Sequence, residues 1–287
     1  MNNPYFIAEI SSNHNGNLKR CFKIIDKAKE AGFDAVKFQL FRIEKLFDQK
    51  VIKKKKFLNK RKQWELPYKF IPKIKKYCLK KKIDFGCSPF DLDAVEELKK
   101  YVDFFKIASY EILWDELFEK CIATKKKLIF STGMATSKEI KNRLKYLKRK
   151  KFEKISILHC VSSYPAEVES LNLETISYLR SLVYNNKTKV GWSDHSVNEA
   201  VIYKSIFKYD AEIIEMHFDL EGKGFEFKFK HCWLPHQAKD LIQNIRLLKN
   251  SNNYFGKKIS KSEKVERKWR TDNFDGLRPL IEIRKSI

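Results

Sequence analysis

The chain has 287 residues, of which 43% are hydrophobic and 33% charged, a balance that excludes a mainly disordered protein and allows a large buried core. Its 60 Lys and Arg residues against 36 Asp and Glu residues give a formal net charge of +24. The excess is mostly lysine in scattered runs, such as Lys53 to Lys56 and Lys148 to Lys151. We interpret these runs as solvated helix faces, with a nucleic-acid surface as the alternative, because no module that reads nucleic acid with Arg and aromatic residues is visible. Either way, a positive field would concentrate an anionic substrate.

The cysteines and the N-terminus indicate where the protein resides. Six cysteines are dispersed without a CxxC pair or zinc-finger spacing, and several lie in apolar runs, which predicts free, buried thiols. No signal peptide is visible at the N-terminus, and no apolar run approaches the ~20 residues that span a bilayer. We therefore expect a cytoplasmic protein with no membrane partner.

Eight short, β-rich apolar runs recur along the chain, each followed by a longer stretch of helical periodicity. Residues 18–31 are one such helical stretch, and Gly32 supplies its stop signal. The eight runs are residues 5–10, 35–39, 83–87, 104–108, 128–131, 156–160, 190–192 and 213–218.

This alternation predicts a parallel sheet. A doubly wound open sheet would also fit, but it usually has six strands, so eight regular units favour an α/β fold of the (β/α)8 TIM-barrel class. The long connection between residues 40 and 83 is interpreted as a loop excursion followed by the second helix. We predict a single barrel domain over residues 1–250, with a last helix near residues 237–249. Residues 251–287 are then a C-terminal extension without a separate domain.

Functional side chains gather where these predicted strands end, which is where (β/α)8 barrels carry their active sites. Any one buried lysine or histidine is more often structural than functional, so the interpretation depends on the convergence of all eight strand ends in one cavity. In chain order, the candidates are Glu9, Lys37, Gln39, Ser88, Lys106, Ser109, Glu111, Ser131, Ser162, Tyr164, Ser193, Asp194, His195, Glu215 and His217.

Charge suggests roles for some of these candidates. Two interior lysines are costly unless an anion neutralises them, so Lys37 and Lys106 predict a phosphate and carboxylate receptor. His195 and His217 end adjacent strands and could hold a metal such as Mn, Fe, Co or Zn, with positions left for water and substrate. Glu9 and Asp194 are candidates for general-base work, for positioning water or for supporting the metal ligands.

Eight short motifs, in order, resemble the N-acetylneuraminate (sialic acid) synthase family. Each motif is weak alone, but together they cover roughly residues 7–218. They are Ile7-Ala8-Glu9-Ile10 with Asn13-His14-Asn15-Gly16, Val36-Lys37-Phe38-Gln39, Ser88-Pro89-Phe90-Asp91, Lys106-Ile107-Ala108-Ser109, Ser131-Thr132-Gly133-Met134-Ala135-Thr136, His159-Cys160-Val161-Ser162-Ser163-Tyr164-Pro165, Gly191-Trp192-Ser193-Asp194-His195 and Glu215-Met216-His217-Phe218.

The resemblance implies a metal-dependent condensation of phosphoenolpyruvate with an N-acetylated hexosamine, which releases phosphate and forms a sialic-acid-type nonulosonic acid. It also implies Mn or Mg as the cofactor, held by His195 and His217, and a homodimer. Glu9 would orient the attacking water, with Asp194 as a second catalytic candidate. Phosphoenolpyruvate would be held by Lys37, Ser88, Lys106, Ser109, Ser131 and Ser193, and the amino sugar by Gln39, Tyr164, Glu111 and Ser162.

Two departures from the family pattern concern the sugar. Typical members append an antifreeze-like domain that gives an arginine to the neighbouring barrel, and this sequence resembles a short form without it. Arg270 or Arg278 could substitute, or the tail could pack on the barrel exterior. The family's Gly-Pro-Asp loop is replaced by residues 222–227, where Glu226 could take over the acid's role.

Two competing functions remain from the sequence. A related metal-dependent barrel aldolase or lyase would use the same histidines with another aldehyde acceptor. A nucleic-acid-associated protein would exploit the net charge, but it leaves the lysines and histidines at the strand ends unexplained.

Overall fold

The computed structural model describes residues 3–185, 187–251 and 256–286. By its internal contacts the chain divides into two compact units, residues 1–249 and residues 250–287. The larger unit contains every strand of the sheet.

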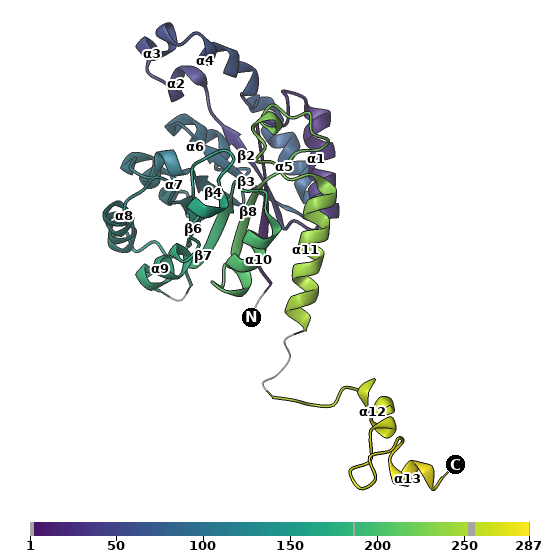
Figure 1. The fold of residues 1–287 in the computed structure, drawn as a ribbon. Helices are drawn as coiled ribbons and strands as arrows, with labels where there is room; N and C mark the ends of the chain where they lie inside the picture. The colour runs from purple at the N-terminus through teal and green to yellow at the C-terminus, as the bar shows by residue number, and fades with distance from the viewer. Residues whose placement is uncertain (1–2, 186, 252–255, 287) are drawn as a thin grey trace. The chain divides into compact units, whose positions relative to one another are not determined.

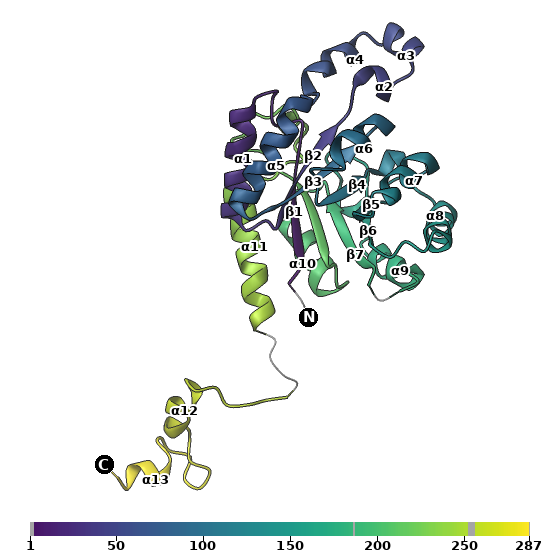
Figure 2. The same ribbon diagram turned by 180° about the vertical axis from the view of Figure 1, so that it is seen from behind.

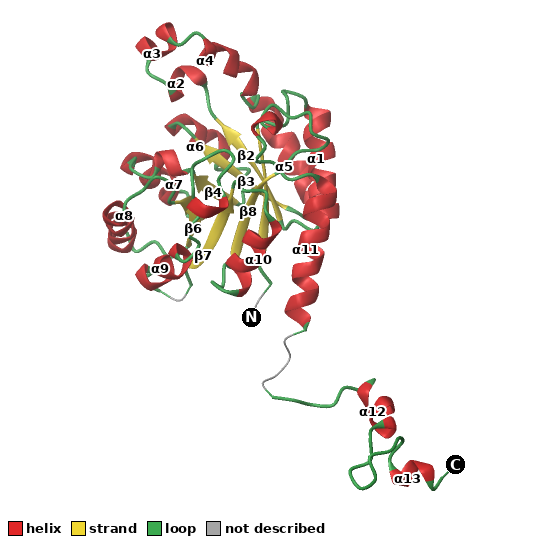
Figure 3. Cartoon of the chain, viewed as in Figure 1, coloured by secondary structure: helices red, strands yellow, loops and turns green. Residues whose placement is uncertain are grey.

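Eight parallel strands form a closed barrel in which each strand pairs with the next and β8 pairs with β1. Figures 1 and 3 show the strands at the centre of this unit. The closed barrel predicted from the sequence is confirmed, and each predicted strand lies within two residues of an observed one. The strands are β1 (Tyr5–Ser11), β2 (Ala35–Leu40), β3 (Asp84–Pro89), β4 (Phe104–Ile107), β5 (Lys127–Ser131), β6 (Ile155–Cys160), β7 (Lys189–Asp194) and β8 (Ile213–His217).

Helices surround the strands, as the views from front and back show (Figures 1 and 2). The helix predicted over residues 18–31 is confirmed, and it begins and ends at the predicted residues. Asn17 caps its start by accepting a hydrogen bond from the Arg20 amide, and Gly32 ends it in the left-handed conformation that glycine adopts readily. The main helices are α1 (Leu18–Ala31), α5 (Ile71–Lys81), α6 (Leu92–Leu98), α7 (Asp115–Ala123), α8 (Ser137–Arg149), α9 (Thr175–Leu182), α10 (Glu199–Phe207) and α11 (Pro235–Asn250).

The hydrophobic core has two layers because neighbouring strand residues point to opposite faces. The larger layer lies between strands and helices and includes Phe38, Phe105 and Trp192. The smaller layer fills the lower barrel interior with Ile7, Ala35, Phe104, Ile129, Leu158 and Ile213. Gly86 makes room for the Phe104 ring, since a Cβ at position 86 would lie 2.1 Å from it. This apolar floor leaves only the upper barrel interior for polar chemistry.

The long connection after β2 forms short helices rather than an irregular loop. They are α2 (Ile43–Leu46), α3 (Gln49–Lys54) and α4 (Phe57–Lys60), followed by 3-10 turns at Arg61–Trp64 and Tyr68–Phe70. Ile43, Ile52 and Leu58 form a small core with Phe41. The Trp64 ring stacks at 6.2 Å on Phe225, so this excursion packs against the loop that follows β8.

The smaller unit, residues 250–287, contains two short helices, α12 (Glu263–Glu266) and α13 (Ile281–Arg284). Asp272 joins its segments by accepting hydrogen bonds from the amides of Phe274 and Ile281. Phe274 is 89% exposed. Arg278 donates to Thr271 within the same unit.

Nowhere in the described residues is there a helix that combines the length and the apolar character needed to cross a bilayer.

Candidate functional site

Polar side chains occupy the upper barrel interior, directly above the apolar floor. On most strands the polar residue stands two positions after a floor residue, for example Lys37 after Ala35 and Lys106 after Phe104. The two-residue period of a strand keeps both on the inner face. Glu9 pairs in register with Lys37 on one side and with His217 on the other. Sequence and closure together therefore gather most of the predicted residues in one ring, but not Asp194, whose oxygens bond to Trp192 and Trp233.

The centre of the ring is a network of two lysines and two glutamates. Lys37 Nζ lies 2.6 Å from Glu9 Oε2 and 3.8 Å from Glu215 Oε1, and Lys106 Nζ lies 3.1 Å from the same Glu215 oxygen. All four residues are at least 95% buried. Gln39 Nε2 donates to Glu9 Oε1 at 2.7 Å.

This network corrects the charge argument made from the sequence. An anionic ligand was expected to neutralise Lys37 and Lys106, but Glu9 and Glu215 already do so within the protein. The sequence placed Glu215 at a strand end without giving it a role. Its position between Ile213 and His217 on alternate residues of β8 is the signal that turns it inward.

The two glutamates differ in acidity. Burial raises the pKa of Glu9 above the ordinary 4.5, because it disfavours the charged form more than Lys37 stabilises it. Burial acts in the same sense on Glu215, but Lys106 and Lys37 together lower the pKa of this carboxyl. Glu9 is therefore the carboxyl that can exchange a proton near neutral pH, whereas Glu215 stays an anion between the lysines.

The predicted serines line the ring on the β3 to β7 side. Ser88 Oγ accepts a hydrogen bond from Lys37 Nζ at 3.2 Å, and Ser193 Oγ donates to Glu215 at 3.1 Å. Ser109 Oγ accepts from the Gly133 amide at 3.1 Å. Ser131 Oγ is buried and has no hydrogen-bond partner among the described residues. Such an atom inside a polar ring is available to a ligand.

Gly133 brings three strand ends together. A Cβ at this position would lie 2.2 Å from Ser162 Oγ and 2.8 Å from Ser109 Oγ, so only glycine fits. Ser162 Oγ and Glu111 Oε2 are buried without a hydrogen-bond partner in the described parts of the chain. Burial also raises the pKa of Glu111 to about 7. Ser162, predicted to hold the sugar, thus lies beside Ser109, predicted to hold phosphoenolpyruvate, and Glu111 ends the turn that begins at Ser109.

Three imidazole rings cluster at the β7 and β8 ends. The ring centroids of His195 and His217 are 5.2 Å apart, and those of His217 and His231 are 4.5 Å apart. The ring of Tyr164 lies 4.2 Å from that of His195 and 5.1 Å from that of His231. Tyr164, predicted to face the sugar, is 41% exposed and lies against the histidines.

The hydrogen bonds of His195 and His217 suit metal ligation. His195 Nδ1 lies 2.8 Å from the Val161 carbonyl oxygen and His217 Nδ1 lies 3.1 Å from Glu226 Oε2. Both partners are acceptors, so each Nδ1 carries a proton, and each Nε2 has a lone pair while its ring is neutral. Burial alone would lower the pKa of His195, but Cys160 raises it above the ordinary value. Burial lowers the pKa of His217 to about 3, so its ring is neutral at pH 7. These residues therefore fit a divalent metal ion.

Glu226 and His231 complete this cluster. Glu226 accepts hydrogen bonds from His217 and from the Ser11 hydroxyl, and His231 Nε2 lies 3.7 Å from the same carboxylate. His231 Nδ1 is buried without a hydrogen-bond partner among the described residues. The sequence singled out Glu226 as a possible replacement acid, but it gave His231 no role.

A cysteine also lies within reach of the histidines. Across the described ranges, the one group of three potential ligands with donor atoms all within 4.8 Å of one another is His217, His231 and Cys232. Asn13 donates to the Cys232 sulfur at 3.5 Å, and burial raises the pKa of this thiol. The thiol is therefore protonated when it accepts this hydrogen bond, and a bound metal ion would have to displace its proton.

Asp194 is held by structural hydrogen bonds. Its Oδ1 accepts from Trp192 and Ser196, and its Oδ2 accepts from the Trp233 ring and the Val197 amide. The side chain is fully buried. These bonds tie the end of β7 to the segment before α11, so Asp194 is better placed to position His195 than to exchange protons with a substrate.

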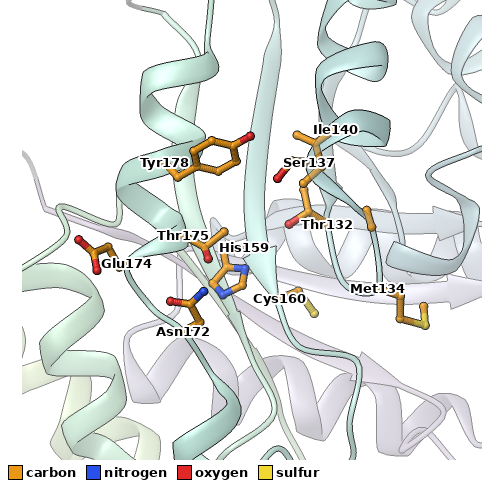
Figure 4. A pocket seen from close by; sticks show the side chains of 11 residues that line it. Thr132, Met134, Ser137, Ile140, His159, Cys160, Asn172, Glu174, Thr175 and Tyr178 are labelled. Atoms are coloured by element: carbon orange, nitrogen blue, oxygen red, sulfur yellow. The ribbon is translucent and has the colours of Figure 1, made fainter.

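A separate cavity of 540 Å³ lies between α8 and α9, over the ends of β5 and β6. In Figure 4, Ser137 and Ile140 of α8 face Tyr178 of α9 across it. His159 follows the inward-facing Leu158 on β6 and so points away from the barrel interior. No residue predicted for substrate or metal lines this cavity, but Cys160 does, and its sulfur lies 4.0 Å from His195 Nδ1, so the cavity borders the ring.

Comparisons with known proteins agree with this geometry. A family model described as the NeuB family matches residues 24–257. The chain is 33% identical to an uncharacterised protein of Methanocaldococcus jannaschii, over 99% of this chain and 78% of that protein. It is 32% identical to the N,N'-diacetyllegionaminic acid synthase of Campylobacter jejuni, over 92% of this chain and 81% of that enzyme.

A solved structure is similar over the whole chain. The sialic acid synthetase of Leptospira borgpetersenii, determined in complex with citrate, aligns with a TM-score of 0.80 and 29% identity, over 100% of this chain and 93% of that one. The family match, the relatives above 30% identity and the ring of polar side chains lead to one conclusion: this chain belongs to the NeuB family and is an enzyme of the acid-synthase type.

Proposed function

We propose that this enzyme condenses phosphoenolpyruvate with an N-acetylated amino sugar, such as N-acetylmannosamine, to form a nonulosonic acid and phosphate. One observation carries the proposal. The Lys37–Glu9–Glu215–Lys106 network, serine oxygens without a hydrogen-bond partner in the described residues, and neighbouring imidazoles all converge on the upper barrel interior. Together they offer sites for an anion, a divalent metal and a polyhydroxylated acceptor.

The lysine side of the ring would hold phosphoenolpyruvate. Lys106 and Lys37 supply charge-assisted hydrogen bonds, and Ser88, Ser109, Ser131 and Ser193 supply neutral donors around them. When the anion binds, the lysines would share their protons between it and Glu215. The same lysines would stabilise charge on the phosphate group as it leaves.

The imidazole side would hold the acceptor and a divalent metal, for which His195 and His217 are the ligands. When bound, the ion supplies Lewis acidity that polarises the open-chain aldehyde of the sugar. Ring nitrogens favour Mn over Mg. Gln39, Tyr164, Glu111 and Ser162 would surround the sugar, and Glu226 keeps the Nδ1 proton of His217 in place.

Glu9 would supply the base for the second half of the reaction. Carbon three of phosphoenolpyruvate attacks the aldehyde carbon, and the electron pair of its double bond forms the new carbon–carbon bond. The C=O π pair of the aldehyde moves to its oxygen, which takes up a proton, and carbon two is left electron-poor. Water adds to carbon two and gives a proton to Glu9, whose raised pKa suits this exchange. The tetrahedral intermediate then breaks its bond to the phosphate oxygen while the hydroxyl on carbon two gives its proton to the leaving phosphate, which yields the keto acid and phosphate.

An assay with a panel of acceptors tests this proposal. Phosphate release and product mass would be measured with phosphoenolpyruvate, Mn and N-acetylmannosamine or the di-N-acetylated hexoses of the legionaminic and pseudaminic type. We expect phosphate release to require one of these sugars and the metal. A product formed from a non-acylated aldehyde, with no sugar-dependent phosphate release, would instead favour an aldolase or lyase.

Replacing Lys106 with methionine is expected to raise the KM for phosphoenolpyruvate about ten- to a hundredfold, the scale of a lost hydrogen bond to a charged group. Because Glu215 would lose its nearest cation, stability would also fall. The double variant Lys106→Met/Glu215→Gln removes that unpaired charge, and Lys127→Met, an exposed lysine at the start of β5, is the matched control. An unchanged KM in both Lys106 variants would remove Lys106 from the substrate site.

A further inference from the structure

His231 and Cys232 lie beside His217, but the proposed reaction uses neither of them. One ligand atom from each of these three residues lies within 4.8 Å of the other two, and all three residues are buried. Two donors bound to one tetrahedral ion are ~3.5 Å apart, so small side-chain rotations would bring the three onto a common ion. The group therefore has the size of a metal site.

The three imidazoles also have the spacing of rings around one ion. Their centroids are 4.5 Å apart for His217 and His231, 5.2 Å for His195 and His217, and 6.2 Å for His195 and His231. Rings that each place one nitrogen ~2.1 Å from an ion have centroids about 4.5 to 6.5 Å apart. His195 lies outside the 4.8 Å group and would be the most distant donor. His231 can therefore join the two histidines that the sequence predicted.

Glu226 faces one nitrogen of each of two rings and leaves the other nitrogen for an ion. Its Oε2 lies 3.1 Å from His217 Nδ1 and 3.7 Å from His231 Nε2. The remaining nitrogen of the second ring, His231 Nδ1, is buried and makes no hydrogen bond within the described residues. Such an atom costs free energy unless a ligand or an ion engages it. A carboxylate that orients imidazoles in this way is the usual support of metal-binding histidines.

Cys232 adds a sulfur donor to these nitrogens. The residue is 4% exposed, and its sulfur accepts a long hydrogen bond of 3.5 Å from Asn13 Nδ2. Asn13 also donates to the Phe218 carbonyl and accepts from the Glu226 amide, so the group that faces the sulfur is held in place. An ion that binds the sulfur as a thiolate displaces its proton to solvent.

The charges of this cluster balance around a divalent ion. Both oxygens of Glu226 accept hydrogen bonds, Oε1 from Ser11 and Oε2 from His217, as an ionised carboxylate does. With the thiolate of Cys232 the cluster then carries two negative charges, which one divalent ion neutralises. Burial of the loaded site therefore leaves no charge without a counter-charge.

We propose that His231 and Cys232 are additional ligands of the metal ion and make the site selective for Zn over Mn and Mg. Thiolate sulfur is a soft donor that suits Zn, whereas Mg and Mn favour oxygen ligands. With His195 and His217 the protein supplies four donors, and a fifth position, which Zn can adopt, stays open for the acceptor. The role of the ion rests on the proposed function, but the assignment of its ligands does not depend on turnover.

Cobalt substitution tests the sulfur ligand directly. The full-length enzyme would be freed of metal and titrated with Co²⁺ without phosphoenolpyruvate or sugar, while its absorption spectrum is recorded. We expect an intense near-ultraviolet band from sulfur-to-cobalt charge transfer that is lost in Cys232→Ser. Two controls should keep the band: Cys160→Ser, whose sulfur lies 4.0 Å from His195 Nδ1, and Cys121→Ser, at a buried cysteine of α7.

Competition between Zn and Mn tests the selectivity. Dissociation constants for both ions would be measured against a chelator for the wild type, Cys232→Ser and His231→Gln. Loss of a residue that only supports a metal ligand costs about 10- to 100-fold in metal affinity, so each variant should weaken Zn binding at least tenfold. Cys232→Ser should weaken Zn more than Mn, because it removes the soft donor. His236→Ala, at an exposed histidine of α11, should change neither constant.

Four results would overturn the proposal. They are a wild type that binds neither Zn nor Co, a cobalt enzyme without the sulfur band, a band that persists in Cys232→Ser, and Zn affinity that neither variant changes. A band lost in Cys160→Ser instead would assign the sulfur ligand to Cys160 and reject Cys232. Failure of the proposed function is distinguishable, since an enzyme that binds Zn through Cys232 but releases no phosphate with any acceptor keeps the ligands and refutes the reaction.

Discussion

Replacing His217 with alanine is expected to remove most bound metal and to lower kcat/KM by about a thousandfold or more, while the fold is retained. Lewis-acid stabilisation by a metal is worth several kcal/mol, and each 1.36 kcal/mol is a factor of ten in rate. His217 contributes its Nε2, since Nδ1 is committed to Glu226. Metal content after dialysis against Mn, and steady-state kinetics on the same samples, measure both effects.

The control for this variant is His236→Ala, which removes an exposed histidine on α11 and leaves the ring untouched. Circular dichroism and the unfolding temperature would show that both variants are folded. A His217→Ala enzyme with full metal content and turnover, after metal removal and readdition, would mean that these imidazoles are structural.

Replacing Glu9 with glutamine should lower kcat by about a hundred- to ten-thousandfold, the usual contribution of a general base. The amide keeps the shape of the side chain but cannot accept the proton of the attacking water. The substitution also removes the anion 2.6 Å from Lys37 Nζ, so the KM for phosphoenolpyruvate would shift as well.

The role of Glu9 as a base also predicts how turnover changes with pH. Glu9 acts as a base only when deprotonated, and burial favours its protonated form. Wild-type turnover should therefore rise with pH through the raised pKa of Glu9, above the ordinary value of 4.5 and toward neutrality. In the Glu9→Gln enzyme, this rise of turnover with pH (the acidic limb of the pH–rate profile) should be absent.

The matched control is Glu97→Gln, at an exposed glutamate of α6. Its pH profile should equal that of the wild type. An acidic limb that persists unchanged in Glu9→Gln would assign the base to another group, such as Glu111, whose pKa burial raises to about 7.

The sequence predicted the barrel well because the signal for it is local and repeated. Each strand combines β-branched or aromatic residues with a following helical stretch, and stop signals such as Gly32 separate them. Eight such strand–helix units favour a sheet that closes into a barrel. The two-residue period of a strand also explains why Lys37, Lys106 and His217 point into one space.

The sequence did not predict what depends on contacts across the ring. That Glu215 neutralises two lysines requires the spacing between β2, β4 and β8. His231 comes from a loop whose path is set by Asn13, which donates to the Phe218 carbonyl and accepts from the Glu226 amide. Local periodicity carries no information about such distances.

The role of Asp194 depends on partners from two directions. Its position beside His195 is consistent with catalysis, but Trp192 and Trp233 occupy its oxygens in the fold. Trp233 lies 39 residues further along the chain, so the hydrogen bond that determines this role is not visible in the local sequence.

The most direct measurement is a crystal structure of the enzyme with phosphoenolpyruvate and Mn. We predict that the phosphate and carboxylate lie among Lys37, Lys106 and Ser131, with the metal between His195 and His217. Phosphoenolpyruvate bound elsewhere while this ring holds no anion, or a metal away from both histidines, would contradict the proposed active site.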